Sequence, residues 1–194
     1  MSGIILGAII LLGAFFGIRY NQQVDVARME SLLVDMENIK TQGNNKQPSQ
    51  VITDLESALG KFSESGQKQR AKLLLGDVYY QNEQFDKSIA LYDDVIRRSS
   101  VSDLSNGLAQ LGLAYSYEGK KEYKKAMGVY RSIIDHKNAS VPLLPVYLDL
   151  VRCYESDNDL KNALLVLREA KNKFQNSTDM EKIDRQIRRL EKLS

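Results

Sequence analysis

The sequence predicts an all-α protein, in which a single N-terminal transmembrane helix is followed by a solenoid of helical repeats. Three observations predict this class. A long uncharged apolar run opens the chain, the rest keeps a helical spacing of apolar residues, and one pattern of Leu, Gly and Tyr recurs three times. The composition agrees, because the chain has only 3 prolines and no tryptophan, and is rich in residues that favour helices.

The opening run predicts a membrane anchor at residues 1–20. Residues 3–18 carry no charge and are followed at once by Arg19 and Tyr20. At about 1.5 Å per residue this run spans about 24 Å, and its neighbours extend it towards the ~30 Å hydrocarbon core. A secretory signal would need a basic start and small residues near the end of the run, and neither is present. A cleaved signal or a buried soluble helix remains the alternative.

Four glycines within the run are candidate helix-packing residues. Gly3 and Gly7, and again Gly13 and Gly17, are four residues apart, a spacing that lets another transmembrane helix approach closely. Glycine is also common in membrane helices without such a role. The few charges on either side of the run do not decide its orientation.

Residues 21–66 are predicted to form a helical pair that is continuous with the anchor. Apolar residues recur at helical spacing from Val24 to Ile39, and residues 41–48 (TQGNNKQP) have the composition of a turn. A second helix is expected at about residues 49–63, before the break at Gly66.

Residues 67–176 are predicted to form three repeats, each of two helices. In the first helix of each unit we align Gly76, Gly112 and Val151, which are followed three residues later by Tyr79, Tyr115 and Tyr154. The second helices carry small and large residues at a matching spacing, namely Ser88, Tyr92 and Val95, then Ala126, Tyr130 and Ile133, then Ala163, Leu167 and Ala170. This is the tetratricopeptide repeat (TPR) pattern. The alignment gives the second unit two extra residues, Lys120 and Lys121, in its turn.

Residues 177–194 are predicted to form a helix that caps the stack. Thr178 and Glu181 have the spacing of a capping box. One face is apolar, with Met180, Ile183, Ile187 and Leu190, and the other is strongly basic. We interpret the basic face as a solvated surface rather than a lipid or nucleic-acid site.

A TPR stack is expected to bind other proteins through a concave face, which the first helix of each unit lines. In the alignment above, the candidate partner-binding residues are Arg70, Leu73, Asp77, Tyr80, Ala109, Leu113, Tyr117, Leu148, Arg152 and Glu155. Their mixture of apolar and charged side chains suits an extended segment or a helix of another protein better than a small metabolite. The alternative is that the chain's own terminal helix fills this face.

No residue pattern predicts an enzyme, a cofactor site or a metal site. The net charge of +2 argues against nucleic-acid binding. The single cysteine, Cys153, lies beside a packing tyrosine in an apolar helix and is expected to be a core thiol. The single histidine, His136, is expected near a helix C-terminus, where a cation suits the helix dipole.

The junction between the anchor and the first soluble helix, Gly17 to Arg28 (GIRYNQQVDVAR), resembles the YfgM-like family of ancillary SecYEG translocon subunits. The order of anchor, continuing helix and small TPR domain is similar over nearly the whole chain. The resemblance implies a non-enzymatic, single-pass inner-membrane scaffold. Its soluble domain would lie in the periplasm and associate with the translocon, periplasmic chaperones or their clients. The family usually has a cytoplasmic segment before the anchor, where this sequence has Met1 and Ser2. A structural accessory subunit of another large membrane complex is the alternative.

Overall fold

The structure is a computed structural model that describes residues 27, 30–31, 34, 48–61, 66–136, 139–175 and 178–193. The helices of this part are α2 (Pro48–Lys61), α3 (Gly66–Gln81), α4 (Phe85–Arg98), α5 (Leu104–Gly119), α6 (Tyr123–Asp135), α7 (Leu143–Ser156), α8 (Leu160–Lys173) and α9 (Met180–Glu191). The described residues contain no strand, so the all-α prediction is confirmed for them.

The membrane anchor predicted at residues 1–20, with Gly3, Gly7, Gly13 and Gly17, lies outside the described residues. Within the part of the chain that the structure describes, no helix combines the length and apolar character needed to cross a bilayer. Most of the helix predicted from residue 21 onward also lies outside that part.

The chain divides into two compact units, Met1–Leu74 and Leu75–Ser194, and the boundary falls inside α3. In the first unit, α2 is amphipathic and buries Leu55 and Ala58, which are three residues apart on one helical face. It begins at Pro48, a residue that is favoured in the first turn because its nitrogen has no proton to leave unpaired.

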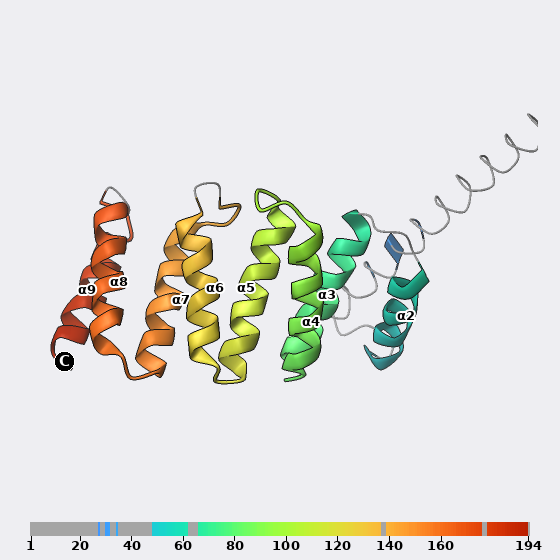
Figure 1. The fold of residues 1–194 in the computed structure, drawn as a ribbon, viewed down its shortest axis with the longest axis horizontal. Helices are drawn as coiled ribbons and strands as arrows, with labels where there is room; N and C mark the ends of the chain where they lie inside the picture. Colours follow the sequence, from blue (N-terminus) through green and yellow to red (C-terminus); the bar gives the residue numbers. More distant parts are fainter. Residues whose placement is uncertain are drawn as a thin grey trace, which may run out of the picture. The chain divides into compact units, whose positions relative to one another are not determined.

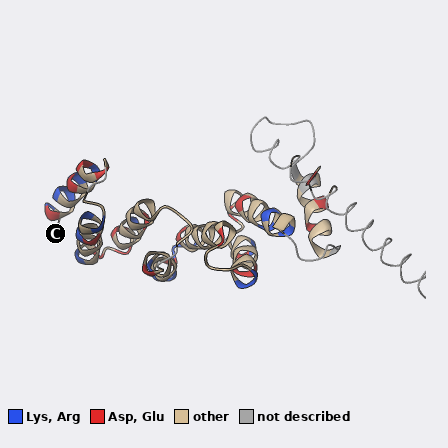
Figure 2. Cartoon of the chain, turned by 90° about the horizontal axis from the view of Figure 1, so that it is seen from above, with Lys and Arg blue, Asp and Glu red and all other residues tan. Residues whose placement is uncertain are grey.

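In the second unit the helices follow one another in a row, and each helix from α4 to α9 packs against the next (Figure 1). Seen from above, successive helices alternate between two layers (Figure 2). We call the layer of α5, α7, α9 and the end of α3 (residues 75–81) the odd-helix face. The layer of α4, α6 and α8 is called the even-helix face.

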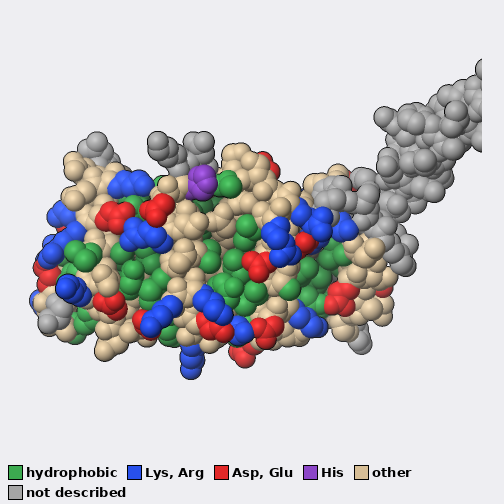
Figure 3. Space-filling view, in the orientation of Figure 1, with side chains coloured by type: hydrophobic (Ala, Val, Ile, Leu, Met, Phe, Trp, Pro, Cys, Tyr) green, Lys and Arg blue, Asp and Glu red, His purple; other side chains and the backbone are tan. Residues whose placement is uncertain are grey.

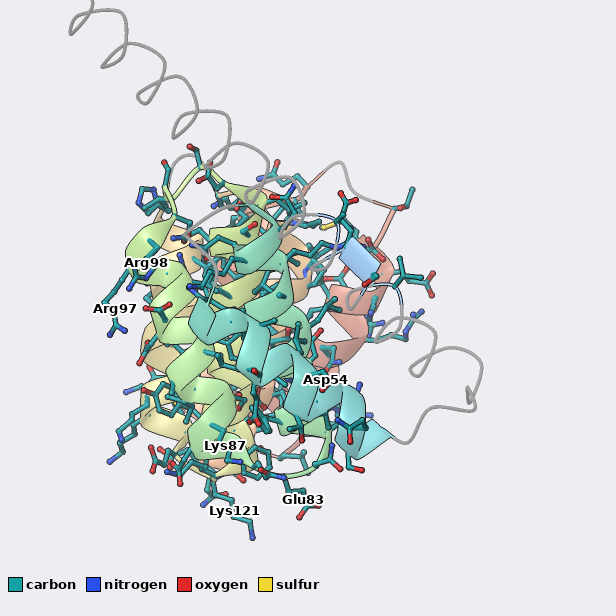
Figure 4. All side chains as sticks on the ribbon, turned by 90° about the vertical axis from the view of Figure 1, so that its right-hand side faces the viewer. Asp54, Glu83, Lys87, Arg97, Arg98 and Lys121 are labelled. Atoms are coloured by element: carbon teal, nitrogen blue, oxygen red, sulfur yellow. The ribbon has the colours of Figure 1, made fainter. Side chains whose placement is uncertain are left out.

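The same turn joins the two helices of every repeat. Glu83, Lys121 and Asn158 have positive φ angles of 58°, 60° and 60°. In each turn this residue's N–H donates to the carbonyl three residues earlier, and the next N–H donates to the carbonyl five residues earlier, as in Glu122 to Tyr117 at 2.8 Å. This is the Schellman arrangement that ends a helix with a left-handed residue. Glu83 and Lys121 extend away from the helices at these turns (Figure 4).

The turns correct the register of the predicted second repeat. Its first helix ends at Gly119 and that of the third repeat ends at Ser156, a separation of 37 residues (156 − 119 = 37). The helices that follow begin at Tyr123 and Leu160, the same distance apart. The prediction of two extra residues in the second turn is therefore wrong, because all three turns have the same length.

This register moves the repeat positions in α5 by two residues. Leu113, Ala114 and Tyr117 are the equivalents of Leu150, Val151 and Tyr154 in α7, and also of Leu75, Gly76 and Tyr79 in α3. The burial pattern agrees, since Leu113 and Ala114 are buried like Leu150 and Val151. The prediction that aligned Gly112 with Val151 is therefore wrong.

Gly112 still has a packing role, because it faces the ring of Tyr92. A Cβ at Gly112 would lie 2.6 Å from Tyr92 Cε1, and one at Gly76 would lie 2.7 Å from the same atom. The Tyr92 side chain of α4 is therefore held between the backbones of α3 and α5. Its exposed fraction is only 2%. The absence of a side chain at these two glycines therefore allows close packing on Tyr92, although the two glycines are not equivalent positions of the repeat.

From α5 onward one continuous hydrophobic core joins the helices. Tyr130 and Tyr147 are fully buried within it, and Cys153 is buried as predicted. Burial raises the pKa of the Cys153 thiol well above its usual range, so the thiol is held in its unreactive protonated form. His136 is the C-cap of α6, also as predicted.

The last helix, α9, extends the row of helices. It buries Ile183 and Leu190, while Met180 and Ile187 pack partly buried against the core, so its predicted apolar face is confirmed. It begins after Asp179, which is the N-cap. The capping box predicted at Thr178 is therefore wrong by one residue.

Candidate protein-binding site

A groove of about 1020 Å³ lies on the odd-helix face of the second unit, between α7 and α9. Its lining from α7 includes Leu144, Leu148, Arg152 and Glu155, and its lining from α9 includes Lys182, Gln186 and Arg189. Residues that recur every three or four positions share one side of a helix, which explains why this set from α7 faces the groove. The alternate side, with Val146 and Leu150, is buried in the core.

Ion pairs cross the odd-helix face from one helix to the next. Arg152 of α7 donates from Nε and Nη2 to the two carboxylate oxygens of Glu118 on α5, at 3.0 and 2.8 Å. Its Nη1 donates to Asp149 at 2.7 Å, so each nitrogen of the guanidinium has a partner. The hydrogen bond with Glu118 is the main reason that the pKa of Arg152 is raised.

The same pairing recurs one repeat later. Arg189 of α9 donates to Glu155 of α7 at 2.5 Å, and both residues lie 37 positions after their counterparts, Arg152 and Glu118. A Gln186 oxygen accepts a further hydrogen bond from Arg189 at 2.8 Å. We call Glu118, Arg152, Glu155 and Arg189 the ionic strip.

Tyrosine hydroxyls donate hydrogen bonds to the carboxylates that pair with Arg152. Tyr130 of α6 is fully buried and donates to Glu118, and Tyr115 of α5 donates to Asp149 at 2.8 Å. Burial, reinforced by these carboxylates, raises the pKa values of both tyrosines well above 10, so their hydroxyls remain donors at any physiological pH. Glu118 and Asp149 are thereby held in fixed orientations for Arg152.

The structure brings three of the predicted binding residues together. Leu148, Arg152 and Glu155 all line the α7–α9 groove. Further along the same face, Asp77 accepts a hydrogen bond from the Tyr92 hydroxyl at 2.7 Å. The ring of Tyr80 lies 6.5 Å from that of Tyr115 on α5.

Two of the predicted residues, Arg70 and Leu73, belong to the first unit. Arg70 is exposed and Leu73 is partly buried. These two residues remain candidates on their own part of α3.

The three predicted residues of α5 do not lie on this face, because of the corrected register. Ala109 is fully buried and offers no surface to a partner. Leu113 and Tyr117 line a different groove of about 590 Å³, together with residues of α4 and α6. That groove belongs to the even-helix side of α5. The prediction of all ten residues on one surface is therefore wrong for these three.

Sequence reasoning missed the residues of α5 that do occupy the odd-helix face. With the separation of 37 residues, Leu111 is the equivalent of Leu148, Tyr115 of Arg152 and Glu118 of Glu155. Equal turn lengths in the three repeats would have been the signal, because they require no insertion at residues 120 and 121.

The face drawn in Figure 3 shows hydrophobic side chains at the surface between groups of acidic and basic residues. Charges of both signs are thus interspersed along the row of helices. The described residues contain no group of His, Cys, Asp or Glu with the geometry of a metal site.

Comparisons with known proteins agree with this architecture. A crystal structure of nearly identical TPR-like repeats from a Podosopora anserina kinesin light chain is similar, with a TM-score of 0.66 and 15% identity, over 84% of this chain and 85% of that chain. A single-substitution variant of that protein is similar to the same degree, over 84% of each chain. At this identity the likeness shows the fold alone. No curated protein sequence matches.

The model of the family described as "Tetratricopeptide repeat-like domain" matches residues 1–139, which is more than half of the chain. Stacks of such repeats are interaction scaffolds in which the surface of the stack, rather than a catalytic centre, carries the function. The chain therefore belongs to the tetratricopeptide repeat-like family.

Proposed function

We propose that this chain is a membrane-anchored scaffold that binds a segment of another protein on the odd-helix face of its TPR-like domain. The observation that carries the proposal is the groove of about 1020 Å³ between α7 and α9. Protein-sized ligands need an extended surface with apolar contacts and polar groups at the rim, and this groove has both. Leu148, Arg152 and Glu155 are among the residues that line it.

The location of the scaffold is proposed from the sequence. The uncharged run at residues 3–18 supports a single-pass anchor. The resemblance of residues 17–28 to the YfgM-like family supports the bacterial inner membrane, with the soluble domain in the periplasm. In this proposal the partners are the translocon, periplasmic chaperones or their clients.

A second candidate is a structural accessory subunit of another large membrane complex. The spacing of Gly3, Gly7, Gly13 and Gly17 favours it, because small residues at this spacing allow close docking on a neighbouring transmembrane helix. This candidate predicts one fixed complex in a mild-detergent purification, and replacement of Gly7 and Gly17 by Leu should release the chain from it.

Site-specific photo-crosslinking of the full chain in native membranes tests the binding face. Lys182 is exposed and lines the groove, so a photoreactive residue at this position should crosslink to a defined protein. The matched control is Lys161, an exposed lysine of α8 outside the lining of the groove. Equal crosslinking from both positions, or none from Lys182, would contradict the proposal.

Protease digestion of spheroplasts tests the location. External protease should degrade the domain while the inner membrane is intact, if the domain lies in the periplasm. Complete protection until the membrane is lysed would contradict the periplasmic placement, and leave the binding face unaffected.

A further inference from the structure

We infer that the odd-helix face recognises an uncharged, apolar segment of its partner protein, and that the ionic strip fixes the spacing of the helices instead of contacting charges on the partner. This inference rests on the proposed function and adds the chemical class of the ligand. It follows from how apolar and charged residues are divided along the odd-numbered helices.

The N-terminal halves of these helices are apolar at the surface. In α7, Leu144, Pro145 and Leu148 line the groove. In α5, 37 residues earlier, Leu108 and Leu111 hold the positions of Pro145 and Leu148. Leu108 is 45% exposed, although α5 packs against both of its neighbours, α4 and α6. We call Leu108, Leu111, Leu144 and Leu148 the apolar strip.

The C-terminal halves of the same helices carry the ionic strip, and its charges are already matched within the chain. Arg152 uses all three of its nitrogens on Glu118 and Asp149, at 2.7 to 3.0 Å. Arg189 donates to Glu155 and Gln186. An acidic ligand would compete with these carboxylates for the arginines, and a basic ligand would compete with the arginines for the carboxylates.

The charges around the groove also balance. Its lining holds three acidic residues, Asp149, Glu155 and Asp179, and three basic residues, Arg152, Lys182 and Arg189. A site with equal numbers of both signs has little net field to attract a charged segment. The surface that remains available to bind a partner is that of the exposed leucines, and it favours apolar side chains.

The experiment measures binding of three fluorescein-labelled peptides to the purified full chain. All have about 12 residues, long enough when extended to cross neighbouring helices. They share alternating leucines, and the positions between them hold serine, aspartate or lysine. We expect the serine peptide to bind at least tenfold more tightly than the other two. Its affinity should change less than twofold between low and high salt, since counter-ions screen only charged contacts.

Leu108→Asp tests whether the apolar strip makes the contact. Because this side chain is 45% exposed, the substitution should leave the fold intact. This substitution should lower the affinity for the serine peptide at least tenfold. Leu165→Asp is the matched control, because Leu165 is a 52% exposed leucine of α8, on the even-helix face, and should leave the affinity unchanged. Circular dichroism spectra of both variants report whether the fold is kept.

Two outcomes would overturn the inference. One is tighter binding of the aspartate or lysine peptide, with strong salt dependence. The other is an unchanged affinity in Leu108→Asp, or no binding of the serine peptide at all. Neither result affects the Lys182 crosslink, which can still identify a partner. If Lys182 gives no crosslink while the peptide still binds in a Leu108-dependent way, the inferred preference for apolar segments is kept. The proposed position of the partner would then be contradicted.

Discussion

The two ends of the second unit use equivalent positions in opposite ways. At the α3–α5 end, the Tyr92 ring fills the space between helices because Gly76 and Gly112 have no side chains to obstruct it. At the α7–α9 end the equivalent of Gly112 is Asp149, which accepts hydrogen bonds from Tyr115 and Arg152, and a groove remains open. Small residues thus serve close packing at one end, whereas polar residues hold an accessible surface at the other.

One end of the repeated scaffold thus contributes mainly to stability, whereas the other end offers a surface for binding. An aromatic ring on a glycine backbone removes apolar area from water and leaves nothing for a partner. Ion pairs on the surface contribute little to folding, but they can fix the distance between helices while apolar residues beside them remain exposed. The following predictions test this division, beginning with the largest expected effect.

Gly112→Ala should strongly destabilise the α3–α5 end. The added methyl would overlap the buried Tyr92 ring, and overpacking of this kind costs about 1–3 kcal/mol. The measurement is the thermal unfolding midpoint of the full chain, followed by circular dichroism. Gly128→Ala is the control, because a Cβ there meets nothing within 4 Å and alanine favours helix, so its midpoint should stay equal or rise. Equal midpoints for the two variants would contradict the glycine–tyrosine contact.

Tyr130→Phe should cost about 1–2 kcal/mol, because it removes a buried hydrogen bond to the charged Glu118. The cost stays moderate because Arg152 still pairs with that carboxylate. Arg152→Met in the same background would then leave Glu118 without either partner, and the combined loss should exceed the sum of the single losses. Purely additive losses in this double-mutant cycle would show that the tyrosine does not support the ionic strip.

Lys121→Gly should stabilise the chain by about 0.5–1 kcal/mol, since glycine tolerates the φ of 60° that strains a lysine. Asn158→Gly, at the same position of the next turn, should stabilise the chain by a smaller amount, because asparagine adopts a positive φ more readily than lysine does. Chemical denaturation of both variants gives the two differences. A loss of stability in Lys121→Gly would mean that the turns of the two repeats are not interchangeable.

Acid should weaken the packing of α6 and α7 against α8 through Glu169. Burial alone would raise its pKa, but hydrogen bonds from Arg131 and Tyr147 outweigh burial, and the pKa lies below its usual value. A lowered folded-state pKa stabilises the fold above the unfolded value of about 4.3, and this contribution is lost as pH falls through the folded value. The unfolding midpoint of the wild type should therefore drop more between pH 6 and pH 3 than that of Glu169→Gln. Equal drops would exclude this origin of acid sensitivity.

Much of the fold could be predicted from the sequence because it depends on local patterns. Alternation of apolar and polar residues at helical spacing predicted the helices, and the buried faces of α8 and α9 carry the predicted residues, such as Ala163, Leu167 and Ile183. Leu148, Arg152 and Glu155, which were predicted on one face of α7, line the same groove, because the register of α7 was unambiguous.

The register of α5 was misassigned from the sequence, because two frames fit the same stretch and only the equal turn lengths separate them. Leu111 and Gly112 precede Tyr115 with the repeat spacing, and Leu113 and Ala114 precede Tyr117 with the same spacing. A shift of two residues turns a helix by about 200°, at roughly 3.6 residues per turn, so it exchanges the core for the surface. That is why three candidate residues of α5 were misplaced while those of α7 were not.

The sequence by itself determined that this chain is a helical repeat protein, because periodicity and turn composition are encoded within each short segment. Only the tertiary structure decided which side of α5 faces its neighbours, since Tyr92 must find Gly112 opposite it. It also decided that Glu118 and Arg152 pair across two helices, because such contacts join residues far apart in the chain. The division of the odd-helix face into an apolar and an ionic strip is therefore a property of packing, which no single segment encodes.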